Sequence, residues 1–140
     1  QLGAQAPMVD FAAARALYER LSKAIEQGLV ASCHDCSDGG LGVALAESAF
    51  AGGLGMKVDL TSIPVDNILI ALFSESASRL VVTVHPDKAA AFEKVMAGSA
   101  VTALGEVVAD TTFTVTGHNG VSFSAPLAEL KQAWQGPLRW

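Results

Sequence analysis

The first part of the chain carries apolar residues at the spacing of an amphipathic helix. Between Asp10 and Gly28 one helical face collects Phe11, Ala14, Leu17, Tyr18, Leu21, Ala24 and Ile25. Gly28 is a typical helix end, and the short apolar segment 29–34 then predicts a buried strand. A second helix is expected from Leu41 to the glycine pair at 52–53.

The rest of the chain alternates strand and helix patterns. Residues 56–60 and 79–84 have strand composition, and a loop with a short helix within 66–73 separates them. Pro86 opens an amphipathic helix that ends at Gly98, and residues 103–108 return to strand composition. Segments 112–115 and 121–123 flank an Asn-Gly hairpin signal, and Pro126 opens a last helix.

These elements predict an α+β fold: a single mixed, largely antiparallel sheet with helices packed on it. The length, 140 residues, is that of one ordinary domain, so we assign residues 1–140 to a single domain. The chain begins at Gln1 without an initiator Met, which we interpret as a fragment of a longer polypeptide.

Composition and charge narrow the classes of partner. Only 16% of residues are charged, against about 25% in typical soluble domains, so we expect companion domains to cover part of the surface and the isolated domain to self-associate. A net charge of −5 with scattered Lys and Arg argues against nucleic acid. The longest apolar run, 68–73, is too short to span a membrane, and no signal peptide is visible, so we expect a soluble cytoplasmic protein.

The sequence HDCSDGG places a dense polar turn between the first strand and the second helix. Free N–H groups at a helix start attract phosphate, and Gly39 and Gly40 let a ligand approach the backbone. Asp35 and Asp38 would repel bare phosphate unless a hard cation lay between, so the turn favours a Mg²⁺-nucleotide. The alternative is that Ser37 or Asp38 caps the helix and Asp35 bonds to loop amides.

Cysteine and histidine positions add little chemistry. Cys33 and Cys36 have the spacing of a zinc half-site, but no second pair exists, so we interpret them as free buried thiols. His34 is interpreted as a satisfied interior residue, His85 as a helix cap and His118 as a turn residue.

A second polar segment, LFSESASRLVVTV, precedes the strand at 79–84. Its polar residues could hold the hydroxyls, amide or phosphate of a ligand, with the guanidinium as a charged donor. They are Ser74, Glu75, Ser76, Ser78 and Arg79. The alternative is that Arg79 pairs with Glu75 across a turn that the serines cap.

HDCSDGGLGVALAESAFAGG and LFSESASRLVVTV together resemble the C-terminal domain of the aminoimidazole ribonucleotide synthetase superfamily, and within it the second such domain of phosphoribosylformylglycinamidine synthases. The resemblance runs from about residue 10 to 134. It implies an ATP-dependent amidotransferase of purine biosynthesis, in which formylglycinamide ribonucleotide, ATP, Mg²⁺ and ammonia give the amidine, ADP and phosphate. Hydrogenase-maturation members of the superfamily are the alternative.

The resemblance also implies residue roles. Asp35 would ligate Mg²⁺, Ser37, Asp38, Gly39 and Gly40 would contact the nucleotide, and Glu75-Ser76-Ala77 would correspond to a substrate-holding segment. Ala77 and Ser37-Asp38 depart from the pattern of the first such domain, which fits a second copy that either binds an auxiliary nucleotide or only stabilises the assembly. We assign no catalytic residue.

The partners that the resemblance implies are the upstream domains of the same synthase, a separate glutaminase subunit and a small accessory subunit. In isolation the chain is expected to be inactive. A purely structural domain of the same enzyme is the rival hypothesis.

Overall fold

The computed structural model describes residues 8–138. Its helices are α1 (Phe11–Glu26), α2 (Gly40–Gly52), α3 (Ile68–Phe73), α4 (Ala89–Val95) and α5 (Leu127–Gln135). Its strands are β1 (Ser32–Asp35), β2 (Gly55–Asp59), β3 (Leu80–Thr83), β4 (Gly105–Val108), β5 (Thr112–Thr116) and β6 (Ser122–Pro126). The α+β class and the order of elements expected from the sequence are confirmed.

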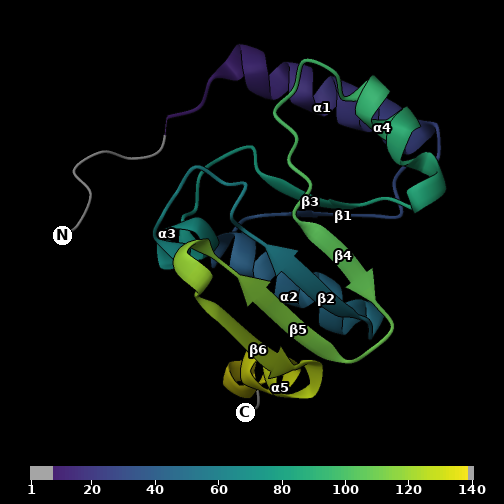
Figure 1. Cartoon of the computed structure of the whole chain (residues 1–140). Coiled ribbons are helices and arrows are strands. Elements are labelled where there is room, and N and C mark those ends of the chain that lie inside the picture. The colour runs from purple at the N-terminus through teal and green to yellow at the C-terminus, as the bar shows by residue number, and fades with distance from the viewer. Residues whose placement is uncertain (1–7, 139–140) are drawn as a thin grey trace.

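The strands divide between two sheets, where the sequence pattern predicted one. Strands β1 and β3 form an antiparallel pair, and the larger sheet has the order β4-β2-β5-β6. In it β2 runs parallel to β5 and the other neighbours are antiparallel. Helix α2 packs against both sheets, since it contacts β1, β3 and β2; it lies behind the four-stranded sheet and below the β1-β3 pair in Figure 1. Its sequence is apolar on nearly every side, as a helix covered from several directions requires.

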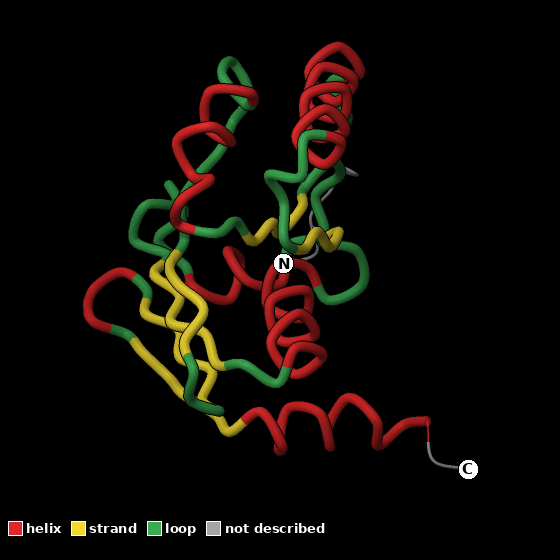
Figure 2. Tube along the Cα trace, turned by 90° about the vertical axis from the view of Figure 1, so that its right-hand side faces the viewer, coloured by secondary structure: helices red, strands yellow, loops and turns green. Residues whose placement is uncertain are grey.

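Two hydrophobic cores result. The larger one lies between α2, α3 and the inner face of the four-stranded sheet, and contains the fully buried Leu60 and Val115. The smaller one joins α1 to α4, through Leu21 and Ala24 on one helix and Phe92 on the other. Figure 2 shows the four-stranded sheet nearly edge-on, with α2 on one side of it and α1 and α4 beyond the β1-β3 pair.

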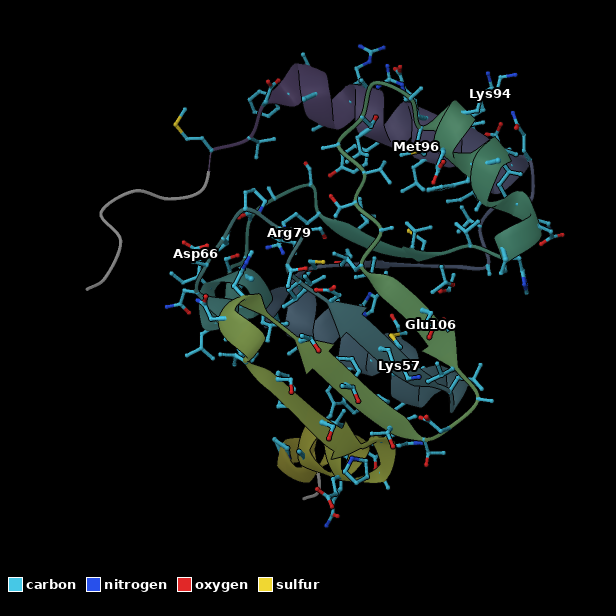
Figure 3. The ribbon with its side chains drawn as sticks, viewed as in Figure 1. Lys57, Asp66, Arg79, Lys94, Met96 and Glu106 are labelled. Atoms are coloured by element: carbon cyan, nitrogen blue, oxygen red, sulfur yellow. The ribbon has the colours of Figure 1, made fainter. Side chains whose placement is uncertain are left out.

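The hairpin predicted around Asn119-Gly120 is present. Strands β5 and β6 pair antiparallel, and both turn residues have left-handed φ, 58° and 71°. The outer face of the sheet is polar: Lys57 of β2 and Glu106 of β4 lie side by side there, 4.0 Å apart (Figure 3). Within residues 8–138, no helix combines the length and apolarity that crossing a bilayer requires.

Candidate functional site

The two polar motifs of the sequence meet in one hollow. Residues 35–38 and 75–80, together with Tyr18 of α1, line a depression of about 450 Å³, which we call the polar hollow. The pairing of β1 with β3 brings the segments together, since Asp35 lies opposite Leu80 and the Cys36 N–H donates to the Arg79 carbonyl at 2.9 Å. The two sites that the sequence suggested separately are therefore walls of a single site.

Gly40 allows the start of α2 to approach the end of α3. Its φ is +63°, and a Cβ at this position would lie 2.7 Å from the Ser74 carbonyl oxygen and 2.8 Å from that of Leu72. Any side chain here would push the 74–79 segment away from the turn at 35–40. The close approach that builds the polar hollow thus requires glycine.

The amide predicted to meet a phosphate already has a partner. The Gly39 N–H donates to Glu75 Oε1 at 2.9 Å, and the Gly40 N–H donates to the Ser37 carbonyl at 3.0 Å. A carboxylate of the protein thus sits where the sequence suggested a ligand anion, at the positive end of α2. A phosphate that uses the Gly39 amide has to displace Glu75.

Arg79 does not pair with Glu75 among the described residues, contrary to the alternative interpretation of the sequence. Its guanidinium donates to the Ser74 carbonyl and hydroxyl at 2.8 and 3.0 Å and approaches the Ala71 carbonyl at 3.4 Å. It lies between α3 and the beginning of β3 (Figure 3). The cation therefore fastens the 74–79 segment to α3 and leaves Asp35, Asp38 and Glu75 as a negatively charged wall.

Tyr18 and the serines complete the outer wall. Ser76 and Ser78 both line the hollow, and the Tyr18 hydroxyl donates to Ser78 Oγ at 3.0 Å. Ser78 holds a left-handed φ of 61°, which is uncommon for a residue with a side chain. Sequence analysis did not place Tyr18 at the site, because its position fits the apolar face of α1.

Asp35 is open to solvent at the end of β1, with 64% of its side chain exposed. Its carboxylate accepts from the Ser37 hydroxyl, which is the main cause of a lowered pKa; the Asp35 amide and His34 lower the pKa further. Asp35 is thus an exposed carboxylate that stays ionised at neutral pH.

In residues 8–138 no group of three His, Cys, Asp or Glu side chains forms a ready metal site. Mg²⁺ is usually held by one or two carboxylates plus the phosphates of a ligand, and an exposed Asp35 suits that mode.

His34 lies in a hydrogen-bonded network that the sequence analysis did not foresee. Its Nε2 is 2.6 Å from Glu47 Oε2 and its Nδ1 is 3.3 Å from Asp35 Oδ1. The Trp134 indole N–H donates to Glu47 Oε1 at 2.6 Å. The bond to Glu47 is the main cause of a raised His34 pKa. One signal was available: Glu47 is the single charged residue in α2.

A second, apolar hollow of about 540 Å³ lies on the other side of this network. Phe50, Leu54, Val107 and Trp134 contribute to its walls, and the His34–Glu47 pair forms its polar side. We call it the apolar hollow. Of its lining residues, only His34 belongs to the polar turn HDCSDGG.

Both cysteines are free thiols, as expected, but Cys33 is exposed and only Cys36 is buried. Burial is the main cause of a raised pKa for each, so neither is an activated thiolate. His85 occupies the N-cap position of the short helical turn at 86–88, as predicted, but its side chain makes no capping hydrogen bond. His118 lies in the hairpin turn, with its Nε2 3.0 Å from the Ile63 carbonyl.

A family model described as the C-terminal domain of AIR synthase related proteins matches residues 1–118. The chain belongs to this family. The phosphoribosylformylglycinamidine synthase subunit PurL of Limosilactobacillus reuteri DSM 20016 is 43% identical over 117 residues, 84% of this chain and 15% of that protein. The subunit of the same name from Caldanaerobacter subterraneus subsp. tengcongensis is 38% identical over 138 residues, 97% of this chain and 18% of that protein. The chain spans less than a fifth of these relatives.

Solved structures agree with this family. Thermotoga maritima PurL complexed with FGAR superposes with a TM-score of 0.78 at 26% identity, over 89% of this chain and 22% of that one. The same protein complexed with ATP superposes with a TM-score of 0.74, over 83% of this chain and 21% of that one. A chain of the HypE–HypF complex superposes with a TM-score of 0.63 at 20% identity, over 78% of this chain and 40% of that one. At this identity it shares the fold alone. Both relatives named above are synthase subunits, whereas the likeness to the HypE–HypF chain shows the fold alone.

Proposed function

We propose that this chain is the C-terminal domain of a longer phosphoribosylformylglycinamidine synthase and that its polar hollow is one wall of a Mg²⁺-nucleotide site. The observation that carries the proposal is the convergence of two distant motifs on one hollow that exposes an ionised Asp35. Thermotoga maritima PurL, whose structures include complexes with ATP and with ADP, supports a nucleotide as the ligand class.

Each wall has a distinct role in this proposal. Asp35 holds the cation, and Ser37, Asp38, Gly39 and Gly40 face the phosphates. The wall formed by Ser74, Glu75, Ser76, Ser78 and Arg79 orients the rest of the ligand. When bound, Mg²⁺ neutralises phosphate charge beside the three carboxylates of the hollow. Glu75 leaves the Gly39 amide to a phosphate and turns toward ligand hydroxyls.

The chain supplies positioning and charge but no nucleophile. In the proposed reaction of the whole synthase, ATP phosphorylates the amide oxygen of formylglycinamide ribonucleotide, and ammonia then displaces phosphate. Such chemistry depends on oriented reactants and stabilised charge. We therefore propose that the chain acts only beside the other domains of the synthase, with a glutaminase and a small accessory subunit as partners, in the cytoplasm, and that it shows no turnover alone.

The test is MgADP binding, measured by calorimetry on the synthase polypeptide that carries this chain. Asp35→Asn keeps the shape but removes the anionic ligand, so affinity should fall about tenfold or more. Asp66→Asn is the matched control: this exposed aspartate lies outside the hollow (Figure 3), and its loss should leave affinity unchanged. Equal affinities of Asp35→Asn and the parent protein would refute the nucleotide site.

A second candidate is a purely structural role, and the Glu75–Gly39 contact favours it. A turn capped by the protein's own carboxylate is complete without a ligand. Under this hypothesis Asp35→Asn costs about 1 kcal/mol of stability or less and leaves nucleotide binding unchanged. The same calorimetric series, combined with urea unfolding, separates the two.

A further inference from the structure

Glu47 occupies an unusual place, as a carboxylate on an otherwise apolar helix. It projects from the middle of α2 and keeps only 25% of its side chain exposed. Both of its oxygens are used: Oε1 accepts from the Trp134 indole and Oε2 from the His34 ring, each at 2.6 Å. Trp134 is itself held by Phe50, with ring centroids 5.6 Å apart. The carboxylate is therefore fixed in orientation from both sides.

A fixed Glu47 fixes the ring of His34. With Nε2 directed at Glu47, the opposite nitrogen Nδ1 is directed at Asp35 Oδ1, 3.3 Å away. A carboxylate oxygen accepts a hydrogen bond from whichever ring nitrogen carries a proton, so the His34 ring is held between Glu47 and Asp35. The bridge connects α5 and α2 to the carboxylate that faces the polar hollow.

Asp35 needs such support because little else restrains it. It stands at the end of a two-stranded ribbon, largely exposed, and its other side-chain contact is the Ser37 hydroxyl in the same turn. Ligands of metal ions are commonly oriented by partners outside the coordination sphere, and the loss of such partners weakens binding.

We propose that Glu47 is a positioning residue for the Mg²⁺-nucleotide site: it holds His34, which orients the Asp35 carboxylate, while Trp134 holds Glu47. The inference rests on the proposed function. It extends the site to three residues, on β1, α2 and α5, that do not line the polar hollow.

A double-mutant cycle on the synthase polypeptide tests this inference, with MgADP affinity as the readout. The variants are Asp35→Asn, Glu47→Gln and the double variant, with Glu129→Gln on the exposed face of α5 as the matched control. Glu47→Gln should weaken MgADP binding about tenfold. The double variant should bind no more weakly than Asp35→Asn, because Glu47 acts only through Asp35. Glu129→Gln should match the parent protein.

The outcomes separate the two proposals. If Asp35→Asn weakens binding but Glu47→Gln does not, or if their losses multiply in the double variant, the positioning role is overturned and the nucleotide site stands. If Asp35→Asn has no effect, both fail. Should Glu47→Gln not fold, Trp134→Phe replaces it in the cycle, since it removes the indole donor while it keeps an aromatic ring; its smaller loss of affinity should again vanish in the Asp35→Asn background.

Discussion

The polar hollow adjoins the N-terminal end of α2, the apolar hollow lies along the second half of the same helix, and the two differ in chemistry. The polar hollow exposes Asp35, Asp38 and Glu75, whereas Phe50, Leu54, Val107 and Trp134 dominate the apolar one. Glu47, the carboxylate of the apolar hollow, already accepts a hydrogen bond on each of its oxygens. The His34–Glu47 pair joins the two hollows through the contact of His34 with Asp35, and in our proposal this link orients the Asp35 carboxylate.

The largest effect is expected from Gly40→Ala, which forces the walls of the polar hollow apart. A left-handed residue with a Cβ against two carbonyl oxygens should lower the free energy of unfolding by about 3 kcal/mol. Gly28→Ala is the matched control: its φ is +67° but its Cβ would meet open space, so about 1 kcal/mol is expected. Urea unfolding of both variants measures the difference; equal losses would mean that the close approach at Gly40 is unimportant.

Trp134→Phe tests the link between the hollows. It keeps an aromatic ring near Phe50 but removes the donor to Glu47, so stability should fall by about 1 kcal/mol. MgADP affinity should fall as well. Leu54→Ala alters the same apolar hollow without touching the network and should leave MgADP affinity unchanged. A matching loss of affinity in Leu54→Ala would show that the apolar hollow acts in some other way.

Tyr18→Phe tests the outer wall of the polar hollow. The lost hydroxyl bond to Ser78 joins two exposed groups, so the free energy of unfolding should fall by only about 0.5 kcal/mol. Ser78→Gly loses the same bond but relieves the left-handed φ of 61°, so it should be at least as stable as the parent. Thermal unfolding ranks the two; a lower stability for Ser78→Gly would contradict a strained Ser78.

The smallest effect is the pH dependence of the His34–Glu47 bond. The folded-state pKa of His34 is raised above 6.5, so its contribution to stability is full below pH 6.5 and is lost as pH rises through the raised value. The stability advantage of the parent over Glu47→Gln should therefore shrink above pH 6.5 in urea unfolding series. A stability difference between the parent and Glu47→Gln that grows with pH would contradict this account.

Asp35 acts at the other end of the pH scale. Its pKa is lowered from 3.8, so its contribution to stability is present above pH 3.8 and is lost as pH falls through the lowered value. Asp35→Asn should therefore remove the acidic window, and it should also reduce the near-neutral one, because the Asp35 carboxylate contributes to the raised pKa of His34.

The sequence was a sound guide to local structure and a poor guide to contacts between distant segments. Hydrophobic period and glycine stops located the helices, and Asn119-Gly120 located the hairpin. The division into two sheets depends on which strands pair with one another, and no local pattern encodes that pairing. Likewise, Glu75 reaches Gly39 across 36 positions, so its occupation of the helix start was not predictable from either motif.

The site residues show the same division. Asp35 and Ser37 share one turn, and their interaction follows from local sequence. Trp134 meets Glu47 from 87 positions away, through the packing of α5 on α2, whereas the local sequence predicts only a helix that begins at Pro126. The charge on an apolar helix was the one usable sign of this network.

A crystal structure of the synthase polypeptide with ADP and Mn²⁺, used in place of Mg²⁺ for its anomalous signal, tests the proposed site most directly. We predict an anomalous peak at coordinating distance from an Asp35 oxygen, bridged to phosphate, with Glu75 moved off the Gly39 amide. Bound nucleotide and metal elsewhere in the protein, with Glu75 still on Gly39 and no peak beside Asp35, would contradict it.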